Sequence, residues 1–325
     1  MNNDIIEVIE KNLTGDFDHD FEYLMKEASH FQKMKGSEAI VKAILDLFQK
    51  HLGEKGRERM MEIASSQIKM RQSQYKKALD EIKNKNYTEA SSLLTNLIDT
   101  FPFNRYDKQT DNKQFNHIVE RILYKQQNNI TNVHQYEEPV SVFYYQLAIT
   151  FRETNDLQGT LEMLDKAIEL NPVCFDYLVL KADTLKRLGN VRGFIENMCK
   201  ALSYAFLTMQ FARGYFLLAA YYEEIGNLEL AYYLYERTTL YSDMNLSIDK
   251  LREIKAKDHK IVSKSMTEVD EILKAYNIPL VPTKEVLKAI KTVLVDTSKP
   301  GLEKIHNSIQ KLYNDITKIR SEEIQ

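Results

Sequence analysis

The sequence predicts an all-α fold whose central part is built from repeated pairs of antiparallel helices. Three stretches align position by position, starting at Ser141, Phe175 and Ala212, so their starts lie 34 and 37 residues apart. A period near 34 residues is typical of helix-turn-helix repeats. The composition of 10 Gly, 6 Pro and no Trp in 325 residues also fits a helical protein. Because one helix pair cannot bury its own apolar face, we expect the pairs to stack as an α-α solenoid.

The aligned positions share their chemistry. Position 8 is alanine in every copy and position 27 is alanine or threonine, so two helix backbones can approach closely there. Large apolar residues at positions 4, 11 and 24 would fill the space between neighbouring pairs. Gly or Asn at positions 15 and 16 tolerates the left-handed conformation that ends a helix. The predicted turns are Asn155-Asp156, Gly189-Asn190 and Gly226-Asn227, and the small residues are Ala148, Ala182, Ala219, Ala167, Ala201 and Thr238.

In these positions the chain resembles the tetratricopeptide repeat family over residues 141–243. A further repeat at 71–102 carries Asn86-Tyr87-Thr88-Glu89-Ala90, similar to the turn motif of that family. The resemblance implies a superhelix of helix pairs. Thr160 and Phe194 replace the usual alanine at position 20, and Phe206 and Asp243 replace the usual proline at position 32, so we expect altered helix spacing at these points.

The flanking regions predict irregular N- and C-terminal helices around this array. Residues 1–70 show helical spacing of apolar residues with a turn at Gly36-Ser37, and the family positions do not fit there. Residues 71–140 hold the additional repeat and a polar segment, 103–140, with a short helix from His117. Since that segment ends about two periods after Arg71, we favour a degenerate helix pair over a mobile insertion. The 37-residue spacing places about three extra residues in the loop around Ser203 to Met209.

Residues 244–325 predict a helical capping region. Ser265 and Glu268 have capping-box spacing, Thr283 is an N-cap, and a last helix opens after Pro300. That helix carries an apolar heptad stripe. We expect it to form an antiparallel pair with the helix that follows Thr283; the alternatives are weak self-association and insertion into the array's own groove. The stripe consists of Leu302, Ile305, Ile309, Leu312, Ile316 and Ile319.

Charge and cysteine content narrow the class of partner. The formal net charge is −3, which argues against a dedicated nucleic-acid binder. No apolar run is long enough to span a membrane, and the acidic N-terminus does not resemble a signal peptide. Cys174 and Cys199 are expected to be free thiols in a reducing compartment. We therefore expect a cytoplasmic protein without membrane or nucleic-acid partners.

Three clusters of polar residues could carry chemistry, and each has a simpler interpretation. Residues 16–20, Asp-Phe-Asp-His-Asp, precede a helix, so capping is favoured over a metal site. The pairs His51–Glu54 and His117–Glu120 are interpreted as polar surface rather than as a di-iron centre. The basic run 250–264 is interpreted as a solvated helix face. We therefore predict no enzyme activity, no metal and no cofactor.

The resemblance implies where a partner would bind. In that family, the first helix of each repeat lines a concave groove, and the floor here is apolar. Only Arg213 matches the basic positions that some members use to hold a terminal carboxylate. The implied function is an adaptor or scaffold that holds a peptide or helix of another protein; the alternatives are a regulator that changes curvature on binding a signal, and a floor covered by the chain's own C-terminal helices. The groove residues are Tyr145, Gln146, Ile149, Arg152, Asp176, Val179, Leu180, Asp183, Lys186, Arg213, Phe216, Leu217, Ala220 and Glu223.

Overall fold

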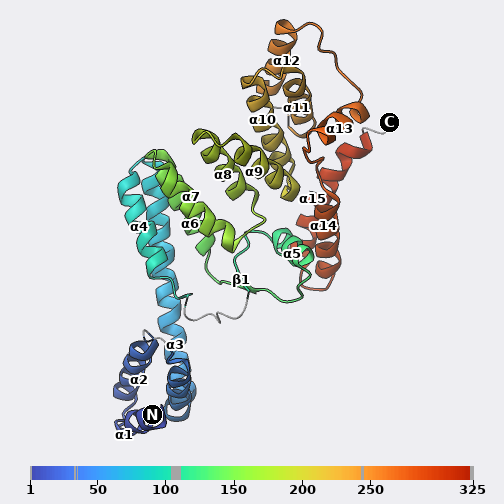
Figure 1. The fold of residues 1–325 in the computed structure, drawn as a ribbon. Coiled ribbons are helices and arrows are strands. Elements are labelled where there is room, and N and C mark those ends of the chain that lie inside the picture. Colours follow the sequence, from blue (N-terminus) through green and yellow to red (C-terminus); the bar gives the residue numbers. More distant parts are fainter. Residues whose placement is uncertain (1, 33, 35, 104–110, 243–244, 323–325) are drawn as a thin grey trace. The chain divides into compact units, whose positions relative to one another are not determined.

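The structure is a computed structural model that describes residues 2–32, 34, 36–103, 111–242 and 245–322, without the side chains of residues 2, 3 and 319–322. The described residues form fifteen helices and two very short strands (Figure 1). The chain divides into two compact units. The first comprises residues 1–79 with 102–107, and the second comprises 80–101 with 108–325.

The first unit is a small helical bundle. Helices α1 (Asn2–Lys11) and α2 (Phe17–Gln32) pack with the first part of α3 (Glu38–Lys83), which leaves helical geometry at Gly53, with φ 53° and ψ −137°. Apolar residues at helical spacing on the three segments meet in one core, which confirms that this region is helical. The core contains Ile9, Phe21, Leu24, Ile40, Ile44, Leu47, Phe48 and Leu52.

The second unit contains three consecutive helix pairs, as predicted. They are α6 (Val140–Glu153) with α7 (Leu157–Leu170), α8 (Phe175–Arg187) with α9 (Val191–Tyr204), and α10 (Thr208–Glu224) with α11 (Leu228–Tyr241). Neighbouring pairs touch through α7 on α8 and α9 on α10, and α4 (Tyr87–Asp99) packs on α6. This packing of adjacent helices is consistent with a helical repeat.

The three predicted turns are confirmed. Asn155, Gly189 and Gly226 have φ values of 61°, 79° and 83°, in the left-handed region that glycine and asparagine tolerate best. The residue after each one caps the next helix by accepting a backbone N–H three positions on. These caps are Asp156, Asn190 and Asn227.

Small residues lie where helices approach most closely. All six predicted small residues are completely buried. Gly214 marks a further close contact that the pattern did not predict, because a Cβ atom there would lie 2.4 Å from Cδ2 of Leu202 on α9. The large apolar residues at repeat position 4 are buried to different degrees: Leu178 and Tyr215 are buried, whereas Tyr144 is half-buried.

Two predictions about irregular segments were wrong. The extra residues before the third pair lengthen α10 to 17 residues, while only residues 205–207 connect it to α9. In place of a degenerate helix pair, the described part of 103–140 holds one helix, α5 (Ile118–Asn128), and strands β1 (Asn112–Lys113) and β2 (His134–Gln135), paired in parallel. Helix α5 packs on α14 (Lys284–Thr297) instead of pairing with a sequence neighbour. Residues 104–110 and Asp243 lie outside the described residues.

The C-terminal region covers the end of the array. Helix α12 (Asn245–Lys257) packs on α11, and Ser265 forms the predicted capping box of α13 (Met266–Ala275). The connection after α13 covers α10, since the Tyr215 hydroxyl donates to the carbonyl of Pro279 at 2.8 Å. Tyr215 occupies repeat position 4, which would otherwise face a following pair.

The last two helices form the predicted pair. Helix α15 (Glu303–Glu322) packs on α14, and Thr283 caps α14 as expected. The heptad stripe is only partly covered: Ile309 and Ile316 are buried, whereas Leu302 and Ile305 are 36% and 43% exposed. The side chain of Ile319 lies outside the described ones.

The buried small residues generate a stability prediction. Replacing Ala182 with leucine should lower the free energy of unfolding by roughly 1–3 kcal/mol, because the site has no room for a larger side chain. Gln158→Leu, at an exposed position of α7, is the matched control. Thermal and urea unfolding measure both variants. An unchanged midpoint for Ala182→Leu would show that this position is not a close contact.

Candidate partner-binding face

The first helices of the three pairs, α6, α8 and α10, carry the residues predicted to line the groove. Contacts between the first helices of neighbouring pairs place their N-terminal halves next to each other. Arg213 Nη1 of α10 lies 2.7 Å from Asp176 Oδ1 of α8. Tyr145 of α6 packs against Tyr177 of α8, with ring centroids 4.8 Å apart. Burial raises the pKa of Tyr145 to about 12, and the charge of Asp176 adds to this effect. This hydroxyl is therefore neutral at physiological pH.

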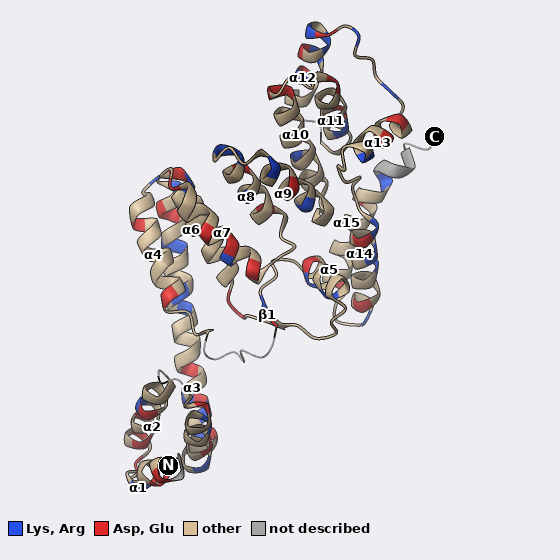
Figure 2. Cartoon of the chain, in the orientation of Figure 1, with Lys and Arg blue, Asp and Glu red and all other residues tan. Residues whose placement is uncertain are grey.

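The charged residues of this face neutralise one another. Besides Arg213 with Asp176, Lys186 of α8 pairs with Glu224 of α10. Within single helices, Arg187 Nε lies 3.2 Å from Asp183 Oδ2, and the Arg152 guanidinium contacts Glu153. Both signs are therefore interspersed along these helices (Figure 2). Among the described residues of this face, no positive charges form an isolated cluster.

The predicted apolar floor is smaller than expected. Val179 and Leu180 are only 2% and 4% exposed, so the prediction that they line an accessible groove was wrong. Leu180 packs into a core with Ala148 and Leu164 of the preceding pair, and Val179 belongs to the main core of this unit. The accessible remainder of the floor is half-buried, and it comprises Tyr145, Ile149, Phe216 and Leu217. Gln146 and Ala220, also predicted to line the groove, are half-buried as well.

The chain itself occupies one end of this face. Glu223 of α10 accepts hydrogen bonds from Lys250 Nζ at 3.3 Å and Lys257 Nζ at 3.2 Å, both on α12, and from the Tyr235 hydroxyl at 3.0 Å. Burial alone would raise the pKa of Glu223, but these donors outweigh it and the pKa is lowered. Glu223 is therefore held by α12 rather than open to a partner.

The basic run 250–264 is correspondingly not a purely solvated face. Besides Lys250 and Lys257, Lys264 pairs with Glu229 at 3.0 Å, and Lys255 lies over the ring of Tyr232. These contacts attach α12 and the following segment to α10 and α11. No local pattern predicts this role, because the acceptors Glu223 and Glu229 lie well upstream of the lysines.

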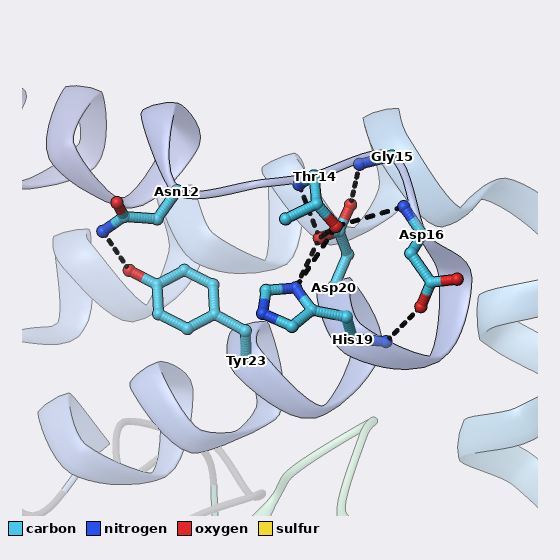
Figure 3. Close-up of polar contacts among 7 residues, drawn as sticks. All are labelled: Asn12, Thr14, Gly15, Asp16, His19, Asp20 and Tyr23. Atoms are coloured by element: carbon cyan, nitrogen blue, oxygen red, sulfur yellow. Dashed lines mark hydrogen bonds and ion pairs between the residues drawn. The ribbon is translucent and has the colours of Figure 1, made fainter.

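The aspartate cluster near the N-terminus is a helix-capping site (Figure 3). Asp16 caps α2 by accepting the backbone N–H of His19 at 2.9 Å. Asp20 is buried and accepts the backbone N–H groups of Thr14 and Gly15, each at 2.8 Å, and the hydroxyl of Thr14. Burial would raise the pKa of Asp20, but these donors and His19 outweigh it and lower the pKa to about 2. The cluster therefore fixes the turn between α1 and α2.

The two His–Glu pairs are unrelated to each other. His51 contacts Glu10 of α1, with Nε2 to Oε1 at 3.2 Å. The interpretation of Glu120 as surface was wrong, because it is only 4% exposed. Its carboxylate closes a capping box with His117 and also accepts from Asn171 Nδ2 at 2.9 Å, so it joins α5 to the turn before α8. Burial raises the pKa of Glu120.

The remaining groups that could carry chemistry are metal ligands and thiols. Within the described ranges, no three His, Cys, Asp or Glu residues converge as a metal site would require. Cys174 and Cys199 are both free thiols, and burial raises the pKa of Cys199 to about 11. Thiols of this kind are poor nucleophiles. No helix in the described part of the chain combines the length and apolar character needed to cross a membrane.

The capping site generates a pH prediction. Because the folded-state pKa of Asp20 is depressed from 3.8 to about 2, ionised Asp20 stabilises the fold, and this contribution is lost as the pH falls through that interval. Asp20→Asn should lower the free energy of unfolding at pH 7 by roughly 1–3 kcal/mol, since an amide cannot accept all of these bonds. Asp18→Asn, at an exposed position of α2, is the control. Equal unfolding free energies for the two variants would contradict this assignment.

Comparison with known proteins does not assign this chain to a family. The sequence matches no protein-family model and no curated protein. The assignment of a function therefore depends on the face formed by α6, α8 and α10, together with the sequence pattern that predicted it.

Proposed function

We propose that the protein is a non-catalytic adaptor or scaffold of the cytoplasm, built on a tetratricopeptide-type superhelix. The face of α6, α8 and α10 would hold a helix or extended segment of another protein. The observation that carries the proposal is two pairs of half-buried apolar side chains on this face, Tyr145 and Ile149 on α6 and Phe216 and Leu217 on α10. The apolar residues predicted for this face on α8, between them, are buried. Apolar side chains on a helix face can serve as anchor points for an amphipathic segment. The two free thiols agree with a reducing compartment.

The charge pairs indicate the chemistry of the partner. Since Arg213 is paired with Asp176 and Lys186 with Glu224, a carboxylate ligand would have to displace an existing pair. Exposed pairs of this type contribute only about 0–1 kcal/mol, so exchange is possible but gives little net affinity. We therefore expect affinity to come from apolar anchors of the partner rather than from a terminal carboxylate.

A second candidate function has support from the same pairs. Arg213–Asp176 and Lys186–Glu224 both connect α8 with α10, near opposite ends of α8. A ligand that exchanged either pair would alter the contact between two neighbouring repeats. The protein would then be a regulator whose array changes curvature on binding a signal. This alternative predicts a change in hydrodynamic radius on ligand binding, whereas a rigid adaptor predicts none.

The proposal is tested by capture from native cell extract followed by mass spectrometry. The double variant Ile149→Glu and Leu217→Glu places one charge in each pair of apolar side chains, and it should lose the proteins that the wild type captures, because a carboxylate cannot be buried there without a partner. The control variant carries Leu188→Glu and Ile225→Glu at exposed turn positions and should retain them. Circular dichroism checks folding, and Ile149→Ala with Leu217→Ala replaces the glutamates if folding fails.

Equal capture by all variants would overturn the proposed site. Loss in the control as well as in the groove variant would show that binding does not depend on this face.

A further inference from the structure

A second surface, on α14, combines unpaired positive charge with exposed apolar groups. A shallow, open hollow of about 590 Å³ lies along one side of this helix, between its own side chains. It is lined by Lys284, Leu287, Lys288, Lys291, Thr292, Val295 and Asp296. Lysines at spacings of four and three residues lie on one side of a helix, so their charges point the same way.

The lysines of this surface differ from those of the array. Among the described residues, Lys284, Lys288 and Lys291 form no ion pair, whereas Lys186, Lys250 and Lys257 are all paired. Lys291 Nζ lies 6.0 Å from the ring centroid of Tyr313 on α15, at the limit of a cation–π contact. Three unpaired cations beside one carboxylate, Asp296, make the hollow attractive to acidic groups.

The apolar component lies in the same hollow. Val295 is 70% exposed and Leu287 is half-buried, while the opposite side of α14 is completely buried through Val286, Ala289, Ile290 and Val293. The helix is also held by its neighbours: Thr283 Oγ1 donates to the carbonyl of Ser203 at 3.1 Å, and Gln126 Nε2 donates to Thr292 Oγ1 at 3.0 Å. A rigid surface loses little entropy on binding.

We propose that this surface of α14 docks an acidic amphipathic helix of a partner protein. Carboxylates at helical spacing would face Lys284, Lys288 and Lys291, and one or two apolar side chains would enter the hollow beside Leu287 and Val295. An acidic helix fits better than an anionic membrane, because its carboxylates can lie opposite the three lysines and avoid Asp296, whereas a layer of headgroups would also cover Asp296. The site is separate from the face of α6, α8 and α10 and does not depend on it.

The test measures binding of two synthetic helical peptides to the full-length protein by fluorescence anisotropy. One peptide has glutamates at positions i, i+4 and i+7 with interleaved leucines, and the other has lysines in place of the glutamates. We expect binding of the acidic peptide only, weakened by added salt. The variant K284E/K288E/K291E should bind the acidic peptide at least about tenfold more weakly, since three attractions become repulsions.

The control variant K166E/K200E/K274E makes the same change in net charge at exposed lysines on other helices, and it should bind as the wild type does. Val295→Ala should weaken binding without changing its salt dependence. Equal binding of the two peptides, equal loss in both triple variants, or failure of the wild type to bind the acidic peptide would overturn the proposal. Sedimentation with phosphatidylserine-containing vesicles, if it alone detects binding, would assign the surface to a membrane instead.

Discussion

Every helix pair in the array depends on its neighbours to cover its apolar face. The contacts that make this possible are short-range, because alanines and Gly214 allow backbones to approach where a larger side chain would collide. Burial of large residues such as Leu178 and Tyr215 then follows from that approach. Since each pair exposes a new apolar face to the next, the array requires an end, and the segments beyond α11 provide it.

The ending of the array shapes the surfaces available to partners. The connection after α13 covers Tyr215, and α12 attaches to Glu223 through two lysines. The chain therefore covers its own last repeat, while the two pairs of apolar side chains on α6 and α10 stay accessible in part. The α14–α15 pair adds a second surface with different chemistry. On the two proposals made above, one partner would bind the face of α6, α8 and α10 and a second would bind the basic surface of α14.

The features that the sequence predicted correctly are local or periodic. Asn155, Gly189 and Gly226 identified their turns, because the ability to adopt the left-handed backbone conformation is a property of the residue type itself. The alanines that recur at the same position of each repeat identified the close helix contacts, because this pattern is visible in the sequence itself. The heptad stripe of the last helix identified its pairing with α14, because the two helices are joined by a short turn.

The features that were missed depend on residues far apart in the chain. Gln126 contacts Thr292 across 166 positions, so the packing of α5 on α14 has no local signal. The burial of Glu120 has no local signal either. Its carboxylate accepts a hydrogen bond from Asn171, which lies far along the sequence. The burial of Val179 and Leu180 is not predictable from the family pattern, since that pattern gives helix faces but not how closely neighbouring pairs pack.

The central claim is that a partner protein occupies the face of α6, α8 and α10. It is tested most directly by photo-crosslinking in the native cell, with a photoreactive residue placed at Gln146 on that face or at Glu162 on α7 as the comparison site. The account predicts a discrete crosslinked product from position 146 and none from position 162. Crosslinking from position 162 alone, or equally from both positions, would contradict it.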